Sequence, residues 1–163
     1  MEQIKITVAE NKEKVYAELL PQLESLVAGE PDFIANLANL AAALKQSLNY
    51  ASWVGFYLLK ENELVLGPFQ GKVACTRIKM GSGVCGTAAA KKEIVIVPNV
   101  YEFPGHIFCD PDSKSEIVIP LIKDQTLFGV LDLDSSDYNC FNSVDAIYLQ
   151  QVAAIVSRVY YGG

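Results

Sequence analysis

Three consecutive strand-like stretches in the middle of the chain constrain the fold most. They read WVGFYLL (53–59), ELVLGPF (63–69) and KVACTRI (72–78), and the polar turn at 60–62 separates the first two. Parallel neighbours need a crossover of a dozen or more residues, whereas antiparallel neighbours need only a tight turn. The spacing therefore predicts an antiparallel meander.

The flanking segments predict helices and three further strands. Apolar residues recur at helical spacing over 15–26, where Pro21 bends or divides the run, and over 33–48 in a helix beginning near Pro31. A short helix is expected at 86–92, strands at 93–97, 115–123 and 127–134, and a last helix from Ser143. We expect one α+β domain over 1–163, with helices at about 9–48, sheet and loops at about 52–135 and the last helix at about 143–160.

The glycine-rich stretch GSGVCG, Gly81 to Gly86, matches the pattern G-x-G-x-x-G of dinucleotide-binding loops. That reading needs a preceding parallel strand and alternating strand–helix units, which the expected meander does not provide. We interpret the glycines as a sharp turn into a helix. Cys85 would then lie in the first turn, where the helix dipole favours a thiolate.

Composition excludes several classes of partner. The net charge of −6 and the lack of a Lys/Arg run argue against nucleic acid or an anionic membrane surface as a partner. No apolar stretch is long enough to span a bilayer, and the N-terminus lacks the apolar segment of a signal peptide. We expect a cytoplasmic protein whose four cysteines are reduced, and are catalytic, metal-binding or simply buried.

The last strand pair predicts a cluster of carboxylates. A three-residue turn at 124–126 would pair Lys123 with Leu127, and this register sets Glu116 opposite Asp134 and residue 118 opposite Asp132. Opposed residues share a face of the sheet, and a slip of one residue would separate them. The alternative is that both aspartates end a strand in solvent. The opposite face is apolar and suits helices.

Such a cluster would attract a cationic ligand. Three neighbouring carboxylates cannot all remain charged, so one pKa should rise and that group could hold a proton near neutral pH. The site suits a small cationic or zwitterionic ligand that receives a proton. Trp53 and Tyr57 share a face of the first strand and could form its wall, although an ordinary core would also use them.

The cysteines allow more than one reading. Cys75 falls on the third strand, and Cys109 in the long loop 98–114, which also holds the only histidine, His106. Zinc held by Cys75, Cys85, His106 and Cys109 is one alternative, but the spacing resembles no zinc knuckle or ribbon. Buried inert thiols are another. Cysteines beside glycine turns and a long loop also suit a thiol relay, in which one thiol captures the sulfenic acid formed on another.

The stretches WVGFYLL, LVLGPFQGKVACTRI, GVCGTAA, GHIFCD, SEIVIPL and GVLDLDS together resemble the free methionine-(R)-sulfoxide reductases, which are GAF-domain enzymes. The resemblance runs from about Phe33 to the last helix. It implies a six-stranded, largely antiparallel sheet with the terminal helices on one face and the ligand pocket on the other. It also implies the reduction of free methionine (R)-sulfoxide, with neither cofactor nor metal.

The resemblance further implies roles for particular residues. Cys109 would attack the sulfoxide sulfur, Cys75 would resolve the product as a disulfide, and Cys85 would be an auxiliary thiol. Glu116, Asp132 and Asp134 would bind the substrate ammonium and help protonate the oxygen, and Trp53 and Tyr57 would line the pocket. Thioredoxin would reduce the disulfide. Local physical chemistry instead favours Cys85 as the attacking thiol.

A second function belongs to another class. GAF domains often act as non-catalytic sensors of small molecules, usually beside an output domain, for which this chain leaves no room. An acidic pocket would also repel a phosphate. Stereochemical preference rests on the resemblance alone. The sequence assigns no role to Cys140 or His106, and a homodimer is compatible with it.

Overall fold

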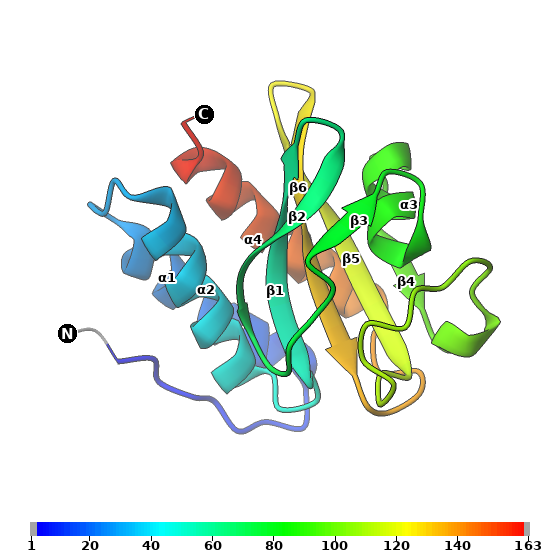
Figure 1. Ribbon diagram of the computed structural model, residues 1–163. Coiled ribbons are helices and arrows are strands. Elements are labelled where there is room, and N and C mark those ends of the chain that lie inside the picture. Colours follow the sequence, from blue (N-terminus) through cyan, green and yellow to red (C-terminus); the bar gives the residue numbers. More distant parts are fainter. Residues whose placement is uncertain (1–2, 162–163) are drawn as a thin grey trace.

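Two antiparallel hairpins meet along β1 and β6 to form the centre of the sheet (Figure 1). The computed structural model describes residues 3–161. The first hairpin joins β1 (Trp53–Lys60) to β2 (Glu63–Gln70), and the second joins β5 (Ser115–Lys123) to β6 (Thr126–Ser135). The short strands β3 (Arg77–Lys79) and β4 (Val95–Val97) complete the order β3-β2-β1-β6-β5-β4, and neighbouring strands are antiparallel. The predicted antiparallel arrangement is confirmed.

Three helices lie on one side of this sheet, and the fourth lies on the other side (Figure 1). The first group comprises α1 (Lys12–Val27), α2 (Phe33–Ser47) and α4 (Ser143–Val159), and α3 (Gly83–Lys91) lies opposite. Helix α1 packs against α2 and α4, and these two contact the strands. The helix-covered face carries the apolar residues predicted for it: Ile117, Ile119, Leu121, Leu131 and Leu133, all buried. Among residues 3–161 no helix is both long and apolar enough to cross a membrane.

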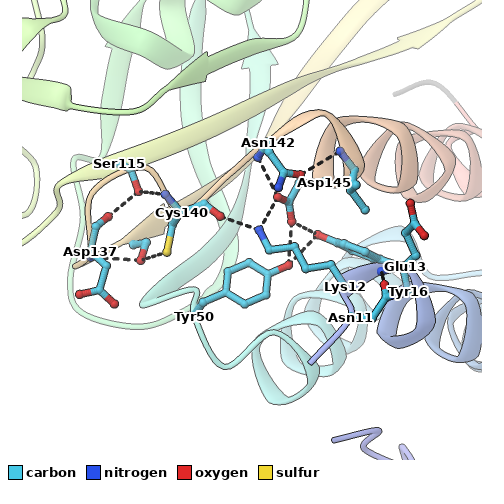
Figure 2. A network of polar contacts seen from close by, with 12 residues as sticks. Asn11, Lys12, Glu13, Tyr16, Tyr50, Ser115, Asp137, Cys140, Asn142 and Asp145 are labelled. Atoms are coloured by element: carbon cyan, nitrogen blue, oxygen red, sulfur yellow. Dashed lines mark hydrogen bonds and ion pairs between the residues drawn. The ribbon is translucent and has the colours of Figure 1, made fainter. Parts of the chain in front are cut away.

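A buried carboxylate fastens α1 to the start of α4 (Figure 2). Asp145 is fully buried and forms an ion pair with Lys12, with 2.6 Å between Nζ and Oδ2. The hydroxyls of Tyr16 and Tyr50 both donate to its Oδ1 at 2.7 Å. Lys12 also donates to the Cys140 carbonyl, so the network ties α1 to the loop that follows β6.

The register of the β5–β6 hairpin is as predicted, although its turn is not. Lys123 pairs with Thr126 across a two-residue turn whose residues, Asp124 and Gln125, both have positive φ. This tight turn is typical of hairpins, and it alone would shift the register by one residue. A bulge that leaves Phe128 unpaired shifts it back, so Glu116 still faces Asp134.

Two other predictions about local structure were wrong. Of the two outcomes expected at Pro21, a bend or a division of the run, only the division is excluded, since α1 runs unbroken from Lys12 to Val27. Helix α3 begins at Gly83, earlier than expected. Cys75 precedes β3 instead of lying on it. Side chains of β1 bond to backbone carbonyls of this segment that a strand would use for pairing: Trp53 donates to the Lys72 carbonyl and Tyr57 to that of Cys75.

Candidate active site

Strand register brings the acidic and aromatic side chains onto the face that α3 covers. Across β1 and β6, Trp53 pairs with Asp134 and Gly55 with Asp132. Across β5 and β6, Glu116 pairs with Asp134. Paired residues in antiparallel strands share a face, so the floor of the site consists of three carboxyl groups beside two aromatic rings.

The aromatic wall depends on a glycine. A Cβ atom at Gly55 would lie 2.4 Å from Cη2 of Trp53, so only glycine lets the indole ring lie across the strand. The ring stacks on Phe69 at 5.3 Å between centroids and approaches Tyr57 at 6.1 Å. Trp53 and Tyr57 also donate hydrogen bonds to the backbone of 72–75, at 3.0 and 2.9 Å. The wall therefore also positions the segment that carries Cys75.

The carboxyl groups are withdrawn from water. Glu116 and Asp132 are each 5 % exposed, and the half-buried Asp134 accepts a hydrogen bond from the Ser113 hydroxyl at 2.8 Å. Burial raises the pKa of Glu116 well above its usual value, and repulsion from Asp132 and Asp134 adds to the rise. Burial raises the pKa of Asp132 to about 6, a rise that the nearby Glu116 and Cys85 groups oppose. Burial therefore disfavours the ionised form of both groups.

A disulfide joins the two loops beside this floor. Cys75 and Cys109 are bonded, with their Cα atoms 5.3 Å apart. The same loops are bridged by exposed charges, because the Lys72 ammonium pairs with Asp112 and lies 3.6 Å from Asp110. The pairing of Cys75 with Cys109 expected from the resemblance is therefore present.

Cys85 does not behave as local sequence reasoning predicted. It lies in the first turn of α3 but is buried, and burial raises the pKa of its thiol well above the usual value, as do Asp132 and Glu116. A helix dipole contributes about 0.3–1 kcal/mol at such a position, whereas burial can shift a pKa by up to about 3–5 units. The prediction of a Cys85 thiolate was wrong because burial and the carboxylates outweigh the dipole.

These groups surround one small cavity of about 40 Å³. Its lining includes nearly all the residues singled out from the sequence, namely Trp53, Tyr57, Cys85, Cys109, Glu116, Asp132 and Asp134. Cys75 reaches it only through its bond to Cys109. His106 lines it too, and Cys140 lies outside, where its sulfur accepts a hydrogen bond from Ser135 at 3.1 Å.

Comparison with known proteins identifies the fold family. The family model described as "GAF domain" matches residues 33–159. The chain belongs to the GAF domain family. It is 55 % identical over 149 residues to GAF domain-containing protein A of Dictyostelium discoideum, covering 91 % of this chain and 94 % of that one. It is 47 % identical over 149 residues to the free methionine-R-sulfoxide reductase of Escherichia coli K12, covering 91 % and 90 %.

A solved structure gives the same result. The free methionine-R-sulfoxide reductase of Neisseria meningitidis, determined in complex with its substrate, superposes with a TM-score of 0.94 at 48 % identity, covering 98 % of this chain and 95 % of that one. The resemblance expected from the sequence, both to the GAF fold and to these reductases, is confirmed.

The glycine-rich stretch of this GAF domain serves the turn into α3. A Cβ atom at Gly86 would lie 2.3 Å from the Lys79 carbonyl oxygen, and the Gly86 carbonyl accepts a hydrogen bond from the Gly81 amide at 2.8 Å. The stretch follows the antiparallel strand β3. It is therefore a packing turn, as predicted, and lacks the parallel strand that a dinucleotide loop requires.

Three of the polar groups that line the cavity of the GAF domain lie close to one another. Donor atoms of Cys85, Glu116 and Asp132 lie within 4.8 Å of one another. The alternative zinc set predicted from the sequence is not available in this state, since the thiols of Cys75 and Cys109 are consumed by the disulfide.

Sequence reasoning missed two contributors to the site. Ser113 donates to Asp134 and thereby connects the loop 98–114, which carries Cys109, to the acidic floor. Lys72 connects the same loop to the Cys75 segment through its ion pairs. Neither residue carries a motif. The one indication in the sequence was the charged and polar segment DPDSK (110–114), which directly follows Cys109.

Proposed function

We propose that the protein reduces free methionine (R)-sulfoxide to methionine, with Cys109 as the nucleophile and Cys75 as the resolving thiol. The observation that carries the proposal is that Cys109, bonded to Cys75, lines the same cavity as Glu116, Asp132 and Asp134. Reductases of this activity from Escherichia coli and Neisseria meningitidis share about half of the sequence, and the preference for the R epimer rests on their names.

Charge explains why the substrate is the free amino acid. Asp132, whose pKa of about 6 leaves it mostly ionised at neutral pH, binds the substrate ammonium. A peptide bond at that nitrogen would abolish the positive charge. Trp53 and Tyr57 line the side of the cavity that receives the methyl-sulfur end. Glu116, whose pKa burial and the two aspartates raise well above its usual value, keeps its proton and donates it to the sulfoxide oxygen.

The chemistry then runs in two balanced steps. The Cys109 thiolate attacks the sulfur of the protonated sulfoxide and forms a bond between Sγ and that sulfur. This bond and the sulfur–oxygen bond then break as the hydroxyl passes to Sγ, so methionine leaves and Cys109 becomes a sulfenic acid. The substrate sulfur gains the two electrons that Cys109 loses. The Cys75 thiol next attacks the sulfenic sulfur, and the hydroxyl leaves as water. Thioredoxin, acting in the cytoplasm, restores both thiols by disulfide exchange.

A thiol titration tests this function. The fully reduced protein carries four thiols. Without a reductant, methionine (R)-sulfoxide should leave two, because Cys75 and Cys109 pair and the other two cysteines stay free. The S epimer, and a peptide containing internal methionine sulfoxide, should leave four.

The matched control is Cys140→Ser, which lies outside the cavity and should fall from three thiols to one. A non-catalytic GAF sensor, the rival from another class, would retain all four thiols of the wild-type protein with every compound. That result would refute the reductase proposal.

A further inference from the structure

The third cysteine of the cavity is not used by the two-step reaction. Cys85 lies in the first turn of α3 and is 3 % exposed. Helix α3 packs against β5 and β6, and so holds this thiol directly over the strands that carry the acids. Cys85 remains a free thiol while Cys75 and Cys109 are bonded to each other.

The Cys85 thiol has a definite acceptor. Its Sγ donates to Oε1 of Glu116 at 3.7 Å, and donor atoms of Cys85, Glu116 and Asp132 all lie within 4.8 Å of one another. The Oδ1 atom of Asp132 has no hydrogen-bond partner in the described part of the chain. The thiol is thus a neutral donor within reach of two buried carboxyl groups.

From this geometry, and resting on the function proposed above, we propose that Cys85 is a positioning residue that donates its S–H to the acidic cluster and does not exchange electrons with the substrate. A hydrogen bond donated to a carboxylate favours the ionised form, so a thiol that bonds Glu116 and lies within reach of Asp132 favours a cluster that keeps a negative charge, which the proposed function assigns to Asp132. Such a donor keeps an anion available for the substrate ammonium in surroundings that otherwise favour the neutral acid.

Several other titratable groups face the same cavity. They are Tyr57 from β1, Asp134 from β6, and His106 and Asp110 from the loop 98–114. Substitution of Cys85 leaves all four in place. If the pH dependence of binding changes when position 85 loses its hydrogen-bond donor, as in Cys85→Ala, but not when a donor remains, as in Cys85→Ser, the change therefore reports on the donor at this position.

Binding of the product methionine to the inert Cys109→Ser protein, measured by calorimetry between pH 5 and 8, tests the inference. Affinity should fall at low pH as Asp132 becomes protonated. Adding Cys85→Ala should move this fall to higher pH and weaken binding about threefold on the acidic side, since a threefold change equals about half a pH unit. Adding Cys85→Ser, which retains a hydrogen-bond donor, should leave the loss of affinity at the original pH or move it to a lower pH.

Each other outcome has a definite meaning. If the alanine and serine variants both titrate like the parent, Cys85 does not act on the cluster and the inference is wrong. If the Cys109→Ser protein binds no methionine at any pH, the proposed function itself has failed, which is a separate result.

An infrared measurement covers the case in which Cys85→Ala does not fold. In oxidised Cys140→Ser protein Cys85 is the one remaining thiol of the four cysteines. Its S–H stretching band should lie at lower wavenumber than that of a thiol in an apolar solvent, and Glu116→Leu should move it toward the solvent value. A band at the solvent position in Cys140→Ser protein would overturn the inference.

Discussion

Glu116 and Asp134 face each other across the β5–β6 ladder, on the side of the sheet that carries Trp53 and Tyr57. Their neighbours Ile117 and Leu133 point to the opposite side and are completely buried under the helices. One face of the strand pair thus packs in the hydrophobic core, and the other carries the acidic residues of the site. Because burial of the core face determines the register of the strands, it also determines that the acidic side chains lie together.

Asp132 is expected to recognise the substrate ammonium. Asp132→Asn keeps the shape but removes the charge, and should weaken binding of free methionine sulfoxide about tenfold or more, since a hydrogen bond to a charged group contributes about 1.5–3 kcal/mol. N-acetylation of the substrate should weaken binding to the wild type but have little additional effect on the variant. Asp137→Asn, an exposed aspartate beyond β6, is the control. Equal penalties for N-acetylation in both proteins would argue against this contact.

Glu116 is expected to supply the proton to the sulfoxide oxygen. Its pKa is raised, so the acid form persists to higher pH than in an ordinary carboxyl group, and the first-turnover rate should fall as pH rises through that raised pKa. Glu116→Gln should lose this alkaline fall and lower the rate by about 10²–10⁴-fold. Rapid-quench measurements over pH would show both effects. Glu102→Gln, an exposed acid in the loop 98–114, should retain the wild-type profile.

Lys72 is expected to hold the segment 72–75, which carries Cys75, near the loop 98–114, which carries Cys109, when the disulfide is reduced. Lys72→Glu repels Asp110 and Asp112, and should slow disulfide formation by about two- to fivefold, as expected for an exposed ion pair. The first equivalent of methionine should form at the normal rate. The swap Lys72→Asp with Asp112→Lys should restore the second step, and added salt should reduce the difference. A swap that behaves like Lys72→Glu would exclude the electrostatic explanation.

The ion pair between the half-buried Lys12 and the buried Asp145, shown in Figure 2, should contribute to stability. Lys12→Met leaves the Asp145 carboxylate buried without its cation, and such a loss typically costs about 3–5 kcal/mol. Chemical denaturation should show a lower free energy of unfolding. Lys14→Met, at an exposed position on the same helix, should change it little. Equal stability of the two variants would mean that the aromatic hydroxyls of Tyr16 and Tyr50 suffice for Asp145.

The sequence was sufficient for the antiparallel sheet and for the pairing of Glu116 with Asp134, because alternation along two long strands admits few registers. It was insufficient for the turn, where the two-residue connection shifts the register by one residue and the bulge at Phe128 shifts it back. It also failed for Cys85, since burial depends on how α3 packs and not on its position in a helical turn. The roles of Ser113 and Lys72 became visible only through contacts with residues distant in the sequence, Asp134 on β6 and Asp112 in the loop 98–114.

The most direct measurement uses reduced variants in which one cysteine is replaced by serine. Each variant is mixed with methionine (R)-sulfoxide in the absence of a reductant, and the yield of methionine is measured. Cys75→Ser should release about one equivalent and stop with Cys109 as a sulfenic acid, whereas Cys109→Ser should release none. A full equivalent of methionine from Cys109→Ser would contradict the assignment of Cys109 as the attacking thiol.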